Sequence, residues 1–178
     1  MLAYLLIVVA ILTRVVPHAG WWNFTAEGGA LLYFGARRPL REMIVPLAAL
    51  MATDYFLTVF VYRYAFHPAG YVVQWGWYLG MMALGCALLH NRTTFLRVGA
   101  GVVLGPTSFF LLTNYAVWAR SAMYPQTLAG LEGCYVAAIP FYRNDLVSTA
   151  IVAGLAFGLP VLMRRFSDAG AQQALAQK

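Results

Sequence analysis

Residues 98–120 read VGAGVVLGPTSFFLLTNYAVWAR, and this stretch decides the fold class. The run from Val98 to Leu112 has no charged residue. It is followed by an amide, a phenol and an indole side chain, and then by Arg120. A membrane-spanning helix needs about 20 predominantly apolar residues. The stretch therefore predicts one spanning helix, from Phe95 to Trp118.

The composition of the whole chain favours the same class. Of the 178 residues, 62% are hydrophobic and 10% are charged, and the mean hydropathy is +0.69. An ordinary soluble domain has about 25% charged residues. We therefore expect an all-α integral membrane protein with a single domain at 1–166 and a short cytoplasmic tail at 167–178. The net charge of +6 comes from basic residues scattered at segment ends, so no nucleic-acid partner is expected.

Six segments are apolar enough to form a six transmembrane-helix bundle in the lipid bilayer. They are Leu2–Val16, Phe24–Ala36, Leu40–Tyr62, Tyr71–His90, Phe95–Trp118 and Leu146–Met163. The second segment is short and contains Gly28, Gly29 and Gly35. Between the fifth and sixth segments, 119–145 is expected to be a lid-like connection on the outer side.

The placement of basic residues predicts the orientation of this bundle, because cytoplasmic loops carry an excess of Lys and Arg. With six crossings and both termini inside, eight basic residues fall on the cytoplasmic side: Arg37, Arg38, Arg41, Arg92, Arg97, Arg164, Arg165 and Lys178. Four fall on the outer side: Arg14, Arg63, Arg120 and Arg143. We therefore expect a multi-pass protein of a bacterial inner membrane with the N- and C-termini in the cytoplasm.

Motifs for catalysis are absent from the sequence. The only lysine is Lys178, so there is no phosphate-binding P-loop, and neither HExxH nor Gly-x-Ser-x-Gly occurs. The histidines, His18, His67 and His90, lie at different segment ends, and the two cysteines lie in different segments. We expect no enzyme activity, no cofactor and no metal site.

Two carboxylates inside apolar segments are the strongest functional candidates. Glu27 lies near the outer end of the second segment and Asp54 in the outer half of the third. A charged group in a membrane is costly, faces the bundle interior, and often marks a ligand or ion pathway. The alternative is that each carboxylate pairs with an internal arginine such as Arg14. We expect at least one of the two carboxylates to reach an outer pocket.

Aromatic and amide residues gather at the outer side of the predicted bundle. Four of the five tryptophans lie there: Trp21, Trp22, Trp75 and Trp118. An interfacial belt would place aromatic residues at both faces, whereas a pocket for a flat or ring-containing molecule would place them at one. The predicted ligand-binding residues are Asn23, Glu27, Asp54, Gln74, Trp75, Asn114, Tyr115, Trp118, Tyr124 and Tyr135. Asn114 and Trp118 share a helix face, so Asn114 should bond a ligand or a neighbouring helix.

Several stretches, NFTAEGGALLYFGA, the Asp54 segment, TNYAVW and YPQTLAGLEGCYVAAIPFYRND, resemble a family of small bacterial membrane proteins of unassigned function. That family is similar to the substrate-binding (S) components of energy-coupling-factor transporters. The resemblance implies a six-helix bundle that binds a small vitamin-like molecule from outside. It also implies a separate transmembrane coupling subunit with ATPases as a partner.

The chain departs from this pattern at three places. Ala26 stands where the family has proline, and Leu2 stands where metal-uptake S components have histidine. The first segment has Ala3 and Ala10, seven apart, in place of closely spaced alanines. The alternative function is a structural or accessory subunit of a larger membrane complex. Gly-x-x-x-Gly pairs at 76/80, 101/105 and 154/158 could serve such a subunit, or could pack helices within one bundle.

Overall fold

The computed structural model describes residues 1–16 and 22–176, with side chains as far as Met163. Within these residues the chain forms six α-helices and no strand. The helices are α1 (Leu2–Val15), α2 (Glu27–Arg37), α3 (Ile44–Phe56), α4 (Val72–Leu89), α5 (Phe95–Arg120) and α6 (Leu128–Ala176). A 3₁₀ turn, Leu40–Met43, leads into α3, a π-helical turn, Leu57–Val61, follows it, and a 3₁₀ turn, Pro68–Gly70, precedes α4.

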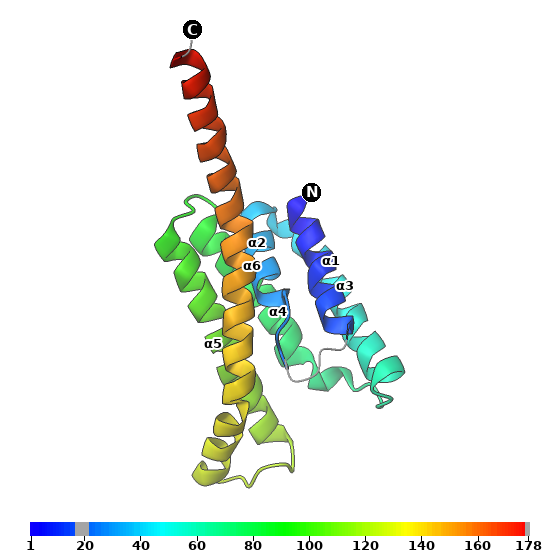
Figure 1. Cartoon of the computed structure of the whole chain (residues 1–178). Helices are drawn as coiled ribbons and strands as arrows, with labels where there is room; N and C mark the ends of the chain where they lie inside the picture. Colours follow the sequence, from blue (N-terminus) through cyan, green and yellow to red (C-terminus); the bar gives the residue numbers. More distant parts are fainter. Residues whose placement is uncertain (17–21, 177–178) are drawn as a thin grey trace.

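Successive helices run in opposite directions, so the bundle has two distinct ends (Figure 1). Met1 and the connections 38–40 and 90–94 lie at one end, called here the Met1 end. Asn23 and the connections 62–71 and 121–127 lie at the other, called the Asn23 end. At the Asn23 end α5 and α6 extend farther than α1 and α2 (Figure 1).

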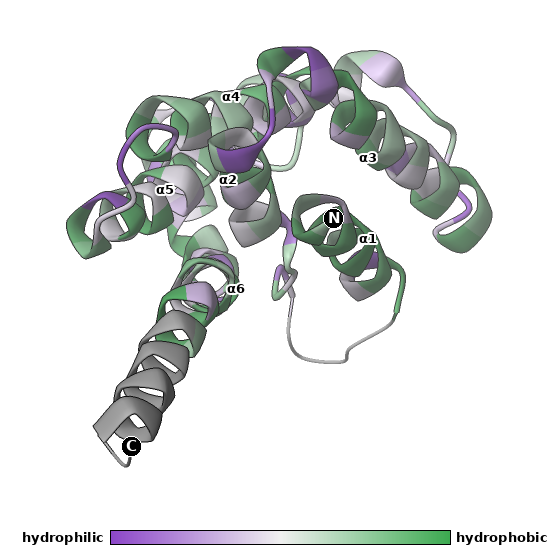
Figure 2. Cartoon of the chain, turned by 90° about the horizontal axis from the view of Figure 1, so that it is seen from above, coloured by the Kyte–Doolittle hydropathy of each residue, from purple (hydrophilic) through white to green (hydrophobic). Residues whose placement is uncertain are grey.

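Four helical segments are long and apolar enough to cross a membrane: Leu40–Val61, Val72–Leu89, Phe95–Arg120 and Leu128–Met163. Seen along the bundle, most helical surface is apolar, and polar residues concentrate in the connections (Figure 2). Of the six expected spans, four therefore have the length and composition to cross a membrane. Helix α1 has 14 residues and α2 has 11, fewer than the roughly 20 that a full span needs.

The short helix α2 is the centre of the bundle and packs against α1, α4, α5 and α6 (Figure 2). All its residues from Gly28 to Ala36 are buried. Its backbone can approach its neighbours because glycines lie at the contacts. A Cβ on Gly35 would collide with the Met82 carbonyl of α4, and a Cβ on Gly85 of α4 would collide with the Leu32 carbonyl of α2. Helix α2 is thus covered by protein rather than lipid, which allows a helix too short to span.

The structure corrects the lid-like connection expected at 119–145. Helix α5 ends at Arg120 and α6 begins at Leu128, so only 121–127 is not helical. The polar residues before Leu146 resemble a helix boundary in the sequence, but they find partners within the fold: Asn144 Nδ2 donates to the Trp22 carbonyl at 2.9 Å, and Asp145 accepts from Thr149. The expected tail at 167–178 continues α6 as far as Ala176, and Lys178 lies outside the described residues.

Of the three Gly-x-x-x-Gly pairs, one packs helices together within this bundle. Gly101 and Gly105 lie against Leu32 and Met81. In contrast, a Cβ on Gly76, Gly80, Gly154 or Gly158 would meet no atom within 4 Å. Sequence spacing alone does not distinguish a glycine pair that faces protein from one that does not.

Candidate functional site

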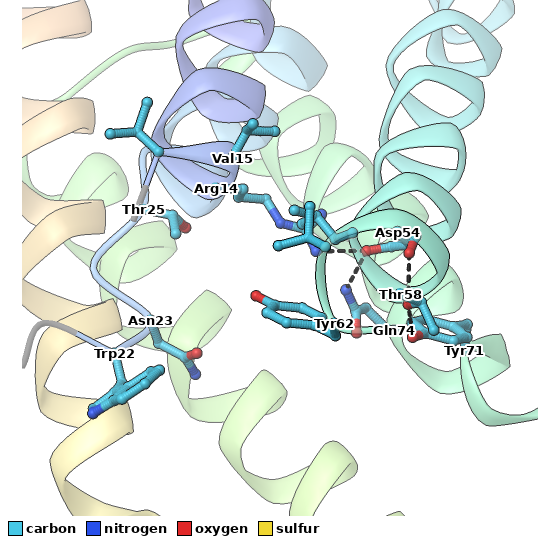
Figure 3. A pocket seen from close by; sticks show the side chains of 13 residues that line it. Arg14, Val15, Trp22, Asn23, Thr25, Asp54, Thr58, Tyr62, Tyr71 and Gln74 are labelled. Carbon is cyan, nitrogen blue, oxygen red and sulfur yellow. Dashed lines mark hydrogen bonds and ion pairs between the residues drawn. The ribbon is translucent and has the colours of Figure 1, made fainter. Parts of the chain in front are cut away.

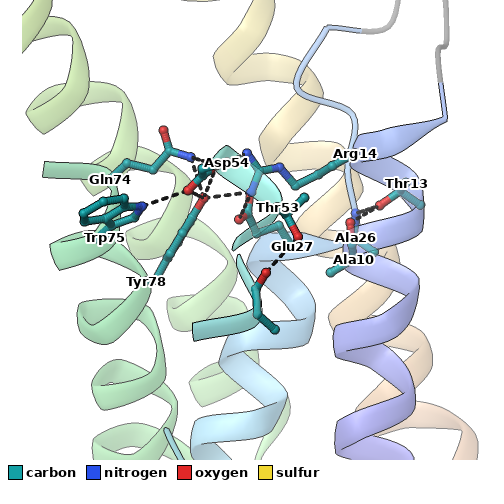
Figure 4. Close-up of polar contacts among 11 residues, drawn as sticks. Ala10, Thr13, Arg14, Ala26, Glu27, Thr53, Asp54, Gln74, Trp75 and Tyr78 are labelled. Atoms are coloured by element: carbon teal, nitrogen blue, oxygen red, sulfur yellow. Dashed lines mark hydrogen bonds and ion pairs between the residues drawn. The ribbon is translucent and has the colours of Figure 1, made fainter. Parts of the chain in front are cut away.

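A charged network joins α1, α2 and α3 near the Asn23 end (Figure 4). Arg14, in the last turn of α1, places Nη1 at 3.2 Å from Glu27 Oε1 and Nη2 at 2.5 Å from Asp54 Oδ1. The side chains are 13% exposed for Arg14, 15% for Glu27 and 1% for Asp54. A buried carboxylate needs such partners, because an unpaired charge in a low-dielectric interior is strongly unfavourable.

Helix α4 supplies the remaining partners of Asp54. Trp75 Nε1 donates to Oδ2 at 2.9 Å, Gln74 Nε2 donates to Oδ1 at 3.2 Å, and the Tyr78 hydroxyl lies 3.2 Å from Oδ2. Tyr78 also accepts from Arg14 Nη1 at 2.9 Å and from Gln74. Asp54 is therefore the centre of a network from four helices, α1 to α4, and the contacts of its own carboxylate are charge-assisted.

The backbone near this network has two unusual features. The π-helical turn Leu57–Val61 follows Asp54 by one turn, and Thr58 donates to the Asp54 carbonyl at 2.7 Å. Such turns are rare and are frequent at functional sites. Asn23 has a positive φ of 60°, a conformation that asparagine tolerates better than most residues. The two features place Thr58 and Asn23 on facing walls of one cavity.

This main cavity has a volume of about 610 Å³ (Figure 3). It is lined by the polar side chains of Arg14, Asp54, Thr58 and Gln74 and by the aromatic rings of Trp22, Tyr62 and Tyr71. The Tyr71 hydroxyl lies beside Thr58 and is hydrogen-bonded to its hydroxyl at 2.5 Å (Figure 3). A volume of this size is typical of small-molecule sites.

Two further cavities adjoin the main one. The first, of about 170 Å³, shares Arg14, Asn23, Thr25 and Gln74 with the main cavity and reaches Glu27, Trp77, Phe109 and Asp145. The second, of about 390 Å³ between α5 and α6, shares Asn23, Phe109 and Asp145 with the first. We call the first of these the inner cavity. The inner cavity shares lining residues with each of the other two cavities and so lies between them.

The ten predicted ligand-binding residues fall into two groups. Asn23, Glu27, Asp54, Gln74 and Trp75 belong to the network or to the cavities beside it. Asn114, Tyr115, Trp118, Tyr124 and Tyr135 lie along α5, α6 and the 121–127 connection. In this second group only Asn114 and Tyr124 line the cavity between α5 and α6. Asn23 lines all three cavities and so connects the groups.

The predicted partner of Asn114 is corrected by the structure. Its Nδ2 donates to the Phe110 carbonyl, four residues earlier on the same helix, at 2.7 Å. A short polar side chain can satisfy itself in this way without a ligand or a second helix. Trp118 donates to the Pro125 carbonyl at 2.9 Å, and the Tyr135 hydroxyl to the Leu111 carbonyl at 2.8 Å. Tyr115 is 55% exposed and packs on Trp118.

Four residues that shape the site were not among those predicted: Thr58, Tyr71, Tyr78 and Asp145. Asp145 is 7% exposed and faces the two smaller cavities. Its charge was a usable signal, but the misplaced start of the sixth segment put it in a connection. The hydroxyls had no signal, because threonine and tyrosine are common in membrane helices and the π-helical turn that positions Thr58 has no sequence pattern.

No metal site is visible in the part of the chain that the structure describes. No group of three or more His, Cys, Asp or Glu residues is close enough to hold a metal ion there. Cys86 and Cys134 are both free thiols. His18 and Trp21 lie outside the described residues.

Comparison with models of protein families shows to which family the chain belongs. The model of one family of unknown function matches residues 1–172. The chain belongs to this family, DUF6580. No curated protein and no solved structure matches the chain. The function of DUF6580 is unknown, so membership in this family assigns no activity to the chain. A function is inferred from the cavities and the charged network instead.

Proposed function

We propose that this DUF6580 protein binds a small molecule in the membrane and is the substrate-binding subunit of a transporter. The observation that carries the proposal is the main cavity. It combines a volume suited to a small molecule with a buried polar residue, Asp54, and exposed aromatic residues, Trp22 and Tyr62, an arrangement typical of ligand sites.

Uptake from outside follows if the Asn23 end faces away from the cytoplasm. The basic residues of the connections favour that orientation, and all three cavities lie toward that end. The chain has no P-loop of its own, so energy for transport would come from a separate coupling subunit and its ATPases. Ala3 and Ala10 are buried within the bundle, at 4% and 0% exposure, so such a partner would contact other residues of the chain.

The test is to fill the main cavity and measure what the protein retains. Val61 lines this cavity, and Val45 lies on the same helical segment at the Met1 end; they are 46% and 49% exposed. We expect a small molecule to co-purify with the parent protein and with Val45→Trp, and to be lost from Val61→Trp. Mass spectrometry of extracts from detergent-purified protein measures this. The proposal fails if nothing co-purifies with the parent, or if Val61→Trp retains the molecule as well as Val45→Trp does.

A second candidate function is an accessory subunit of a membrane complex. It is favoured by a groove of about 570 Å³ between α4 and α5, where Gly76 and Gly80 leave open space. Glycines at this spacing let a second helix approach closely. Replacing both with leucine should then release a stoichiometric protein partner in mild detergent. If the double variant releases a partner and no small molecule co-purifies with the parent protein, this candidate is favoured over transport.

A further inference from the structure

The inner cavity is formed by five helices. Arg14 comes from α1, Glu27 and Gly28 from α2, Gln74 and Trp77 from α4, Phe109 from α5 and Asp145 from α6. It lies directly at the start of the short helix α2, between the main cavity and the cavity of α5 and α6. A molecule in either larger cavity can therefore place one group into it.

Negative charge is in excess around this cavity. Glu27 and Asp145 line it, and Asp54 bonds the two cavity residues Arg14 and Gln74. Among the residues that the structure describes, Arg14 is the only basic side chain that lines it. The N-terminus of α2 adds about half a positive charge. Two carboxylates therefore line the cavity beside one guanidinium, and that guanidinium is shared with a third carboxylate, Asp54.

Asp145 is the carboxylate that lacks a cation. Arg14 forms ion pairs with Glu27 and Asp54, and no basic side chain of the described residues pairs with Asp145. Its only side-chain hydrogen bond there is from Thr149 to Oδ1 at 3.3 Å. No buried polar atom lacks a partner among the described residues, so the other oxygen is open to the cavity space. The residue is 93% removed from solvent, where an uncompensated charge is most unfavourable.

Two aromatic side chains, Trp77 and Phe109, also line the inner cavity. The rings of Trp77 and Phe109 lie with centroids 4.8 Å apart, inclined by 56°. Trp77 directs its Nε1 away from the cavity charge, to the Gly105 carbonyl and the Ser108 hydroxyl. Ring faces attract cations, and most strongly where water is excluded. The carboxylates and the ring faces thus favour the same sign of charge.

We infer that the molecule bound by this protein is an organic cation, and that its positively charged nitrogen occupies the inner cavity between Asp145, Glu27 and the rings of Trp77 and Phe109. This inference rests on the proposed binding function and specifies the chemical class of its ligand. The rest of the molecule occupies the main cavity, where aromatic side chains accommodate a ring. A protonated amine or a charged heterocycle fits this description, and a carboxylate or phosphate ligand does not.

The experiment compares three probes of one shape and different charge: benzylammonium, benzyl alcohol and benzoate. Binding to the detergent-purified protein is measured by equilibrium dialysis, with empty micelles of the same detergent as the reference. We expect benzylammonium to bind at least tenfold more tightly than benzyl alcohol, and benzoate to bind most weakly. Equal binding of the three probes, no binding of any, or a preference for benzoate overturns the inference. The co-purification test of the main cavity is unaffected by that result.

Variants of α6 assign the preference to Asp145. Asp145→Asn should reduce benzylammonium binding about tenfold and leave benzyl alcohol binding unchanged, while Asp145→Glu should retain the preference. Glu132→Gln is the matched control, since it removes one negative charge from an exposed site on the same helix. If a folded Asp145→Asn protein keeps the charge preference of the parent protein, the inference is contradicted. The Asp145 carboxylate would then not be the group that selects the cation. If Asp145→Asn does not fold, the probe series on the parent protein decides alone.

Discussion

Arg14 has two roles in the structure: it forms ion pairs between helices and it lines the main cavity. The sequence left open whether Glu27 and Asp54 pair with an arginine or face a ligand site. In the structure both pair with Arg14, and Arg14 and Asp54 also line the main cavity. The charged residues were predictable because a charge in an apolar segment must be paired or functional. The hydroxyls of Thr58 and Tyr78 were not: a threonine hydroxyl can bond the backbone of its own helix, and a tyrosine is equally common as a packing or interfacial residue.

Replacing Arg14 with methionine should therefore destabilise the protein. The change leaves Glu27 without its cation and removes the charge partner of Asp54, and breaking a buried ion pair in this way costs about 3–5 kcal/mol. Thermal unfolding in detergent measures the loss. Arg97→Met is the control, because Arg97 is exposed and its side chain bonds only the Leu88 carbonyl among the described residues. Equal unfolding temperatures for the two variants would show that the network does not hold α1, α2 and α3 together.

At the scale of the element, the contact between α2 and α4 depends on glycines in both helices. Gly35 and Gly85 each face a backbone carbonyl of the other helix, which no side-chain rotation can move away. The sequence predicted that α2 is short and rich in glycine, but it did not predict that α2 is buried on all sides. Nothing in a single sequence shows which helices surround a given one. The start of α6 was missed for a related reason, since Asn144 and Asp145 are polar residues whose partners are provided by other parts of the fold.

Two alanine substitutions in α4 test this contact. Gly85→Ala should destabilise the protein by about 1–3 kcal/mol, the usual effect of overpacking, because α2 and α4 would have to separate. Gly80→Ala, five residues earlier on the same helix, meets no atom within 4 Å and should stabilise the helix by about 0.5–1 kcal/mol. Denaturant titration in detergent gives both values. The close approach of α2 and α4 would be refuted by two variants that change stability in the same direction.

For the whole molecule, the decisive feature is that the cavities are at one end of the bundle. The three cavities share Asn23, and α1 and α2 end short of α5 and α6 at that end (Figure 1). The sequence predicted the all-helical class and an aromatic side to the bundle, because hydropathy and composition report these directly. It did not predict that the first helix as well as the second is shorter than a full span, or that the cavities lie beside the ends of these two helices. That geometry depends on tertiary packing around α2.

The orientation of the bundle decides to which compartment the cavities open, and so from which side the proposed ligand would come. Asn91 lies in the connection at the Met1 end and Met123 in the connection at the Asn23 end, and both are exposed. In a background with Cys86 and Cys134 replaced by alanine, we expect Met123→Cys to react with a membrane-impermeant maleimide in intact cells. Asn91→Cys should react only after the cells are opened, because the basic residues beside it favour the cytoplasm. The reverse labelling pattern would mean that the cavities open to the cytoplasm. The protein would then bind a molecule from inside the cell, which contradicts uptake from outside.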